Sequence, residues 1–147
     1  MKLYFDTCCY NRPFDDWSQF RIRREAGAIL KIRGWCRRYG HTIFSSAVLD
    51  EEIGQISDID RHRDVLSFYR KTATEPAFCV DEAIFRINRL TAGVNIGELD
   101  ALHLSFAESA GADYLLTTDD DFEKVCDGMS LIVKVINPLK FNFGGTV

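Results

Sequence analysis

Four acidic residues stand at positions along the chain that suit metal chemistry. Asp6 ends a short apolar run, and Asp119 follows a strand-like run. Glu52 and Asp100 lie in the first turns of two predicted helices. Because strand ends and helix starts meet at one edge of an open α/β sheet, we expect the four carboxylates to converge at that edge.

Carboxylates that converge in this way repel one another by about 4 kcal/mol for each close pair at an effective dielectric constant near 20. A divalent cation relieves that repulsion, and oxygen ligands suit Mg²⁺ or Mn²⁺. The pattern therefore predicts that Asp6, Asp100 and Asp119 hold a metal ion directly or through water, and that Glu52 completes the acidic cluster. A metal ion at such a site activates water for the cleavage of a phosphodiester bond.

Two of these acids stand in acidic runs, and each has an alternative. Glu52 lies on the predicted core side of its helix and is favoured over Glu51, which falls farther round. Asp119 is nearest the preceding strand and is favoured over Asp120, although such a run is also typical of a solvated helix start. Asp6 has the alternative role of capping a helix or turn.

Alternating strand-like and helix-like segments position these acids. Helical spacing in the longer segments and β-branched or aromatic residues in the short ones predict an α/β fold with parallel strand pairing through crossovers. The segment 72–80 is left as a link, and residues 141–147 are expected to fray. The predicted strands are residues 2–6, 41–44, 114–117 and 131–136, and the predicted helices are residues 18–39, 45–56, 60–71, 81–92 and 98–110.

Length and composition indicate one soluble domain that spans residues 1–147. The 147 residues are 46% hydrophobic and 27% charged, and no apolar run approaches the ~20 residues that span a bilayer. The start of the chain lacks a signal-peptide pattern, and five cysteines without C-x-x-C spacing favour a reducing cytoplasm. A net charge of −4 argues against a generally basic nucleic-acid-binding surface, but a metal can neutralise an acidic nuclease site locally.

The chain resembles the PIN-domain ribonucleases, including toxins of the VapC type. The resemblance rests on four ordered motifs: M-K-L-Y-F-D-T at residues 1–7, S-A-V-L-D-E-E-I at 46–53, L-D-A-L-H at 99–103 and L-T-T-D-D-D-F at 116–122. The extension C-C-Y-N-R-P-F-D-D at residues 8–16 resembles one branch of PIN-like proteins.

This resemblance implies a three-layer αβα sandwich with a mostly parallel central sheet. It also implies a metal-dependent endoribonuclease that leaves a 5′-phosphate and a 3′-hydroxyl, with RNA as substrate, an antitoxin as a candidate protein partner and a homo-oligomeric state. The family's catalytic acids carry over to Asp6, Glu52, Asp100 and Asp119. Thr7 matches a family position near the metal and is expected to contribute to substrate binding.

Basic and hydroxyl side chains near these motifs are candidates for substrate binding. Arg12, close in sequence to Asp6, is the favoured partner for a substrate phosphate, and the Thr118 hydroxyl could orient a carboxylate or a water. The helix predicted at 18–39 is strongly basic and forms either a solvated outer face or a surface that follows phosphates, for which Arg21 or Arg24 is best placed.

His103 and the cysteines offer other chemistry. His103 follows Asp100 by three residues and either joins the site or is a satisfied core histidine. A zinc site or a cysteine nucleophile that uses Cys8 or Cys9 is disfavoured, because no paired-cysteine spacing is present. The rival function is a catalytically silent PIN-fold module that binds RNA or protein, and the presence of all four acids disfavours it.

Overall fold

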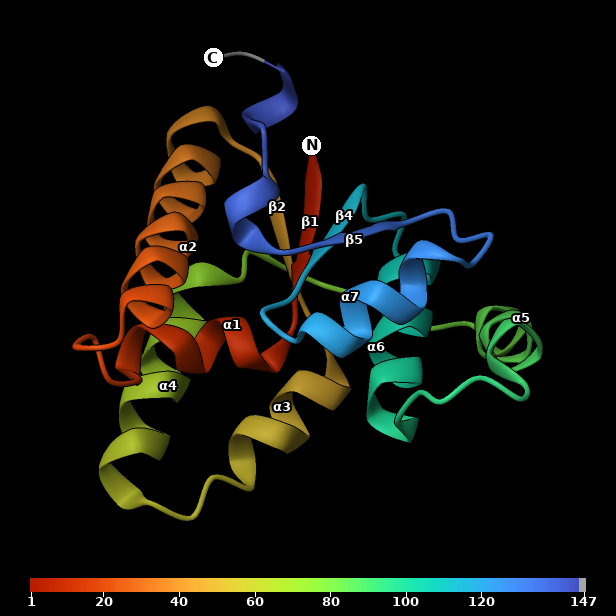
Figure 1. The fold of residues 1–147 in the computed structure, drawn as a ribbon, viewed down its shortest axis with the longest axis horizontal. Coiled ribbons are helices and arrows are strands. Elements are labelled where there is room, and N and C mark those ends of the chain that lie inside the picture. Colours follow the sequence, from red (N-terminus) through yellow and green to blue (C-terminus); the bar gives the residue numbers. More distant parts are fainter. Residues whose placement is uncertain (146–147) are drawn as a thin grey trace.

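Five short strands form one parallel sheet in the computed structural model, which describes residues 1–145. The strand order is β3-β2-β1-β4-β5, so the first strand lies in the middle (Figure 1). All four neighbouring pairs are parallel, as the alternation of strands and helices predicts. The strands are β1 (Lys2–Phe5), β2 (Thr42–Ser45), β3 (Glu75–Pro76), β4 (Tyr114–Leu116) and β5 (Lys134–Ile136).

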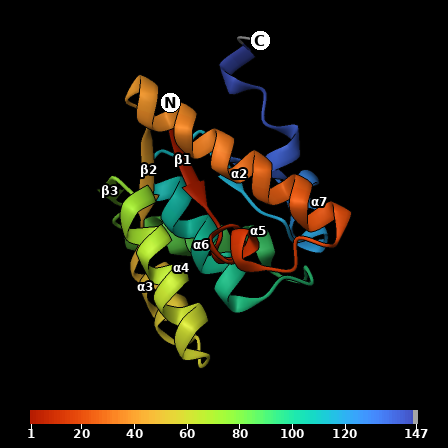
Figure 2. The same ribbon diagram turned by 90° about the vertical axis from the view of Figure 1, so that its left-hand side faces the viewer.

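Helices lie on both sides of this sheet, with α2 on one side and α6 on the other (Figures 1 and 2). The predicted αβα sandwich is therefore confirmed. The helices are α1 (Thr7–Asn11), α2 (Phe20–Tyr39), α3 (Ala47–Gly54), α4 (Ile59–Thr72), α5 (Asp81–Thr91), α6 (Glu98–Ser109) and α7 (Asp120–Asp127), with 3₁₀ turns η1 (Arg12–Phe14), η2 (Pro138–Lys140) and η3 (Phe143–Gly145).

The central strand explains where a site can form. Leu3, Tyr4 and Phe5 are fully buried, because β2 and β4 flank β1 and helices cover both of its faces. Phe5 pairs in register with Leu116, so the residues that follow β1 and β4 emerge side by side. The strand order reverses at β1, because β2 and β3 lie on one side of it and β4 and β5 on the other. Open α/β sheets bind their ligands at the carboxyl edge beside such a point.

The longest helix, α2, matches its predicted span closely. Ala26, Ile29 and Ile32 recur at helical spacing and are buried against the sheet. Gly40 ends the helix in the left-handed conformation with φ of 70°, which a glycine adopts without steric cost.

Besides the 3₁₀ turns, one α-helix and one strand were not predicted as regular structure. Helix α1 is only five residues long, and the Asp6 side chain caps it by accepting a hydrogen bond from the Thr7 N–H. Strand β3 lies inside the segment 72–80 and pairs with the free edge of β2, where Thr74 and Ala77 donate backbone hydrogen bonds to Ile43 and Ser45. Pro76 is tolerated there because β3 is an edge strand.

The expectation that residues 141–147 fray is wrong for Phe141. Its side chain is 6% exposed and packs edge-on against Trp35 and Tyr114, with ring centroids 5.5 Å apart in both pairs. Residues 146–147 lie outside the part of the chain that the structure describes. The segment after β5 therefore covers an aromatic cluster between α2 and β4.

Truncation of this aromatic anchor should destabilise the fold. We expect Phe141→Ala to lower the free energy of unfolding by about 3 kcal/mol, because a buried aromatic side chain leaves a cavity. Urea denaturation measures the change. The exposed neighbour provides the control, since Asn142→Ala should change stability by less than about 0.5 kcal/mol. Equal effects of the two substitutions would contradict the packing of Phe141.

None of the helices within residues 1–145 is both long enough and apolar enough to cross a membrane.

Candidate active site

Asp6 lies at the carboxyl end of β1 with its carboxylate held by protein donors. Oδ1 accepts a hydrogen bond from the Thr7 N–H at 2.8 Å, and Oδ2 accepts one from the Thr117 hydroxyl at 2.9 Å. The side chain is nearly buried, with residue exposure of 6%. Asp6 therefore caps α1, as the alternative interpretation proposed, and at the same time faces the residues that follow β4.

Glu52 points from α3 toward the same place, whereas Glu51 is exposed. The Thr7 hydroxyl donates to Oε1 of Glu52 at 3.0 Å, and Nε2 of His103 contacts the same oxygen. Burial raises the pKa of the Glu52 carboxyl, but the hydrogen bonds and the charge of His103 outweigh it, so the pKa is lower than usual. The helical register thus directs Glu52, and not Glu51, into the cluster.

His103 joins a chain of buried polar groups that the sequence indicated only weakly. It is 1% exposed, and its Nδ1 lies 2.6 Å from the Tyr4 hydroxyl, which in turn lies 2.7 Å from Oγ of Ser46. Its Nε2 lies 3.5 Å from Oδ1 of Asp6. His103 is therefore both a satisfied buried histidine and a neighbour of the acids, and its spacing of three residues from Asp100 was the available signal.

Asp100 is the acid whose charge is least compensated. Burial and, after it, the negative charges of Asp6 and Asp119 together raise the pKa of Asp100 to about 6, despite the opposing charge of His103. Within residues 1–145 no group donates a hydrogen bond to this carboxylate. The structure therefore gathers the acids closely enough that the charges of Asp6 and Asp119 disfavour the ionisation of Asp100.

Asp119 stands between β4 and α7, and its carboxylate caps that helix. Oδ1 accepts hydrogen bonds from the backbone N–H groups of Asp121 and Phe122 at 3.0 and 3.2 Å. The neighbouring Asp120 is instead bound to Arg21, with oxygen–nitrogen distances of 2.7 and 2.8 Å. Of the two aspartates weighed from the sequence, Asp119 is the one that acts electrostatically on Asp100.

The acids of this cluster have the ligand chemistry of a metal site but not its arrangement. Within residues 1–145, no group of three or more His, Cys, Asp or Glu side chains is arranged to hold a metal ion. The donors nevertheless have the chemistry that Mg²⁺ or Mn²⁺ prefers, and the negative charges of Asp6 and Asp119 add to burial in raising the pKa of Asp100. The predicted ligand roles of Asp6, Asp100 and Asp119 therefore stay predictions.

The predicted substrate-binding side chains are largely engaged with the protein. Arg12 donates to the Thr118 hydroxyl at 3.0 Å and to Asp15 at 3.1 Å. The Thr7 hydroxyl donates to Glu52. A substrate phosphate would have to displace or share these contacts, so the roles of Thr7, Arg12 and Thr118 also stay predictions.

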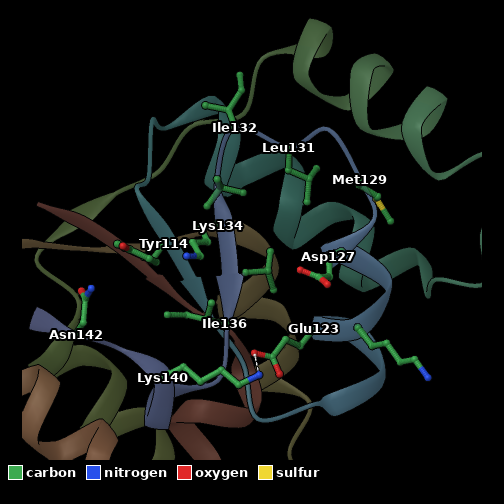
Figure 3. A pocket seen from close by; sticks show the side chains of 14 residues that line it. Tyr114, Glu123, Asp127, Met129, Leu131, Ile132, Lys134, Ile136, Lys140 and Asn142 are labelled. Carbon is green, nitrogen blue, oxygen red and sulfur yellow. Dashed lines mark hydrogen bonds and ion pairs between the residues drawn. The ribbon is translucent and has the colours of Figure 1, made fainter. Parts of the chain in front are cut away.

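Of two surface cavities, one is lined by a member of the acidic cluster and the other is not. A cavity of about 640 Å³ along the outer edge of β5 has Glu123, Lys134 and Lys140 among its lining residues and contains none of the four acids (Figure 3). A cavity of about 390 Å³ does reach the site, because Asp119 lines it together with Arg12, Arg21 and Thr118.

The raised pKa of Asp100 should give the metal-free protein a specific pH dependence. Because the folded-state pKa is about 6 and the ordinary value is 3.8, the protonated form contributes stability below about pH 4, which is lost as the pH rises through about 6. Asp100→Asn imitates the neutral form. In EDTA at about pH 8, the variant should be more stable than the wild type by ~1 kcal/mol, a value reduced by solvent screening of the half-exposed carboxyl.

Urea denaturation at about pH 4 and about pH 8 tests this difference. The two proteins should be similarly stable at the lower pH. A stability difference that does not change with pH would show that folding does not raise the pKa of Asp100.

The parallel sheet and the acids at its carboxyl edge define a class of α/β protein with a carboxylate-rich site. Residues 6–128 match the family described as PIN domain. This match spans most of the chain, which therefore belongs to the PIN domain family. Comparison with curated proteins gives no match.

Solved structures share this fold at low sequence identity. A chain of VapBC2 from Rickettsia felis bound to a DNA fragment from their promoter has a TM-score of 0.57 and 17% identity, and the match covers 93% of this chain and 98% of that chain. A chain of FitAcB from Neisseria gonorrhoeae has a TM-score of 0.56 and 14% identity, with coverage of 95% and 99%. At these identities the similarity shows the fold alone.

Proposed function

We propose that this PIN-domain protein is a Mg²⁺- or Mn²⁺-dependent endoribonuclease. The observation that carries the proposal is the gathering of Asp6, Glu52, Asp100 and Asp119 at one edge of the sheet, where burial and then the negative charges of its neighbours raise the pKa of Asp100. Such repulsion costs stability and is retained where the cluster serves a purpose, as at ligand sites. A divalent cation offsets it, and membership of the PIN domain family supports nuclease chemistry.

The residues of the cluster take different roles in this proposal. Asp6, Asp100 and Asp119 hold the ion, which when bound supplies an activated water and stabilises charge on the phosphate. Glu52 completes the cluster, and its contacts with Thr7 and His103 fix the direction of its carboxylate. Ser46 and Tyr4 in turn hold the imidazole ring in place through the buried hydrogen-bond chain.

The substrate and partners complete the proposal. RNA is the substrate, with Thr7, Arg12 and Thr118 at the binding surface. The likeness to chains of VapBC2 and FitAcB supports a toxin that an antitoxin protein holds inactive. A homo-oligomeric state and a cytoplasmic location are also part of the proposal and do not rest on that likeness.

A cleavage assay tests the central claim. Purified protein is incubated with single-stranded and structured RNA, in Mn²⁺ or in EDTA, and the product ends are identified. We expect internal cuts that leave a 5′-phosphate and a 3′-hydroxyl in Mn²⁺ and no cuts in EDTA. RNA binding without cutting in either condition would instead support the catalytically silent binding module.

A further inference from the structure

A second polar cluster lies next to the candidate active site and is centred on a buried acid. Glu25 of α2 is 0% exposed, although an isolated buried carboxylate is strongly unfavourable. Oε2 of Glu25 accepts a hydrogen bond from Nδ2 of Asn137 at 2.6 Å and one from Nε of Arg21 at 3.3 Å. Nε of Arg12 lies 3.3 Å from the other carboxylate oxygen, Oε1.

The two arginines of this cluster reach the chain that carries Asp119. Arg12 donates to the hydroxyl of Thr118 at 3.0 Å, and Arg21 donates to the backbone carbonyl of the same residue at 3.0 Å. Arg21 also forms two hydrogen bonds to the carboxylate of Asp120. The residues on either side of Asp119 are therefore both held, and Figure 2 shows the start of α2 beside α7.

Charge explains why Glu25 is needed for this arrangement. Two guanidinium groups directed at one short turn repel each other, and the buried carboxylate between them reduces that repulsion in addition to Asp15, which pairs with Arg12, and Asp120, which pairs with Arg21. It also accepts a hydrogen bond from Nε of Arg21 and lies within ion-pair distance of Nε of Arg12, which leaves terminal nitrogens of both arginines to face Thr118 and Asp120. Glu25 itself contacts none of the four acids within residues 1–145.

We propose that Glu25 is a positioning residue, which acts through Arg12 and Arg21 to fix the turn that presents Asp119 to the metal and substrate. The effect on metal binding and cleavage rests on the proposed function, whereas the effect on the turn does not. Groups that orient a ligand from outside its direct contacts typically change metal affinity or activity by 10–100-fold when they are lost. A carboxylate displaced by about 1 Å is enough for such a loss.

The test compares Glu25→Gln with a matched control. Glu108 is also a buried carboxylate paired with an arginine, Arg86, and it accepts a hydrogen bond from the Val133 N–H at 2.9 Å. Glu108→Gln removes the same charge from another buried ion pair, at the far end of α6 from Asp100. Each variant is measured at a temperature where circular dichroism shows it folded.

Three measurements separate positioning from a purely structural role. We expect Glu25→Gln to weaken Mn²⁺ binding by about 10–100-fold, to slow RNA cleavage by a similar factor, and to speed amide hydrogen exchange at Asp121 and Phe122. These two amides report on the turn because both donate to Asp119. Glu108→Gln should leave all three measurements within about twofold of the wild type.

The outcomes distinguish this inference from the proposed function. If the wild type neither binds Mn²⁺ nor cuts RNA, the proposed function fails, and hydrogen exchange alone decides the positioning role. If Glu25→Gln does not fold, Arg21→Gln takes its place, because the Arg21 side chain is 52% exposed and can be changed without opening the core. Unchanged exchange at Asp121 and Phe122 in the folded variant would overturn the inference, whatever the loss of thermal stability.

Discussion

Asp100→Asn is expected to cut RNA at least about 10³-fold more slowly than the wild type while it keeps its fold. The asparagine side chain preserves shape but removes a negative charge from the cluster that would hold the cation. Loss of that charge weakens both the activation of water and the stabilisation of charge on the phosphate, and each effect alone is typically large. Single-turnover cleavage with saturating Mn²⁺ measures the change in the chemical step.

The acidic run on α3 supplies a matched control for this loss. Glu52 faces Thr7 and His103, whereas Glu51 is exposed. Glu52→Gln should also slow cleavage strongly, and Glu51→Gln should change it by less than about twofold. If Asp100→Asn cleaves at the wild-type rate, the catalytic assignment is wrong, and the silent binding module becomes the better interpretation.

Mn²⁺ is expected to stabilise the wild-type protein and to have little effect on Asp6→Asn. An ion that binds only the folded state raises the free energy of unfolding by about 2.7 kcal/mol at a hundredfold excess over Kd. For a protein of this size, that corresponds to a rise of roughly 5–10 °C in Tm. Asp6 lies at the end of the central strand, so its loss should remove most of this rise. Thermal melts in Mn²⁺ and in EDTA measure it.

An exposed aspartate on α7 provides a control substitution that also removes one negative charge. Asp127→Asn changes the net charge by the same amount as Asp6→Asn, yet lies at the far end of the helix from the acids. Its melts should show the full Mn²⁺-dependent rise. Identical midpoints for the wild type with Mn²⁺ and with EDTA would argue against a functional metal site.

Local patterns in the sequence predicted the main strands and the long helices, but not the shortest elements. Apolar spacing along α2 indicated its length, and Gly40 marked its end. Helix α1 contains too few residues for a helical period to be recognised. Strand β3 exists because the free edge of β2 accepts its hydrogen bonds, and no pattern within residues 72–80 reports that edge.

Some features of the candidate site could likewise be predicted from local patterns in the sequence, and others could not. The register of α3 could be argued from Val48 and Leu49, because a helix places such residues on one face. The hydrogen-bonded chain from Ser46 through Tyr4 to His103 could not be predicted, because it joins groups up to 99 residues apart in the sequence. The pair Arg21 and Glu25 is spaced four residues apart, which is typical of an ordinary exposed ion pair on a helix, and nothing local indicates that Glu25 is buried.

The sequence by itself determined which acids stand at strand ends and helix starts, because hydrophobic periodicity and capping are local properties of the chain. Tertiary structure alone decided how those acids affect one another and what holds them. The raised pKa of Asp100 depends on burial and then on the charges of Asp6 and Asp119, which only the pairing of β1 with β4 brings to the same edge. The burial of Glu25 likewise depends on Arg12, Arg21 and Asn137 meeting around it, since only converging partners can compensate a charge removed from water.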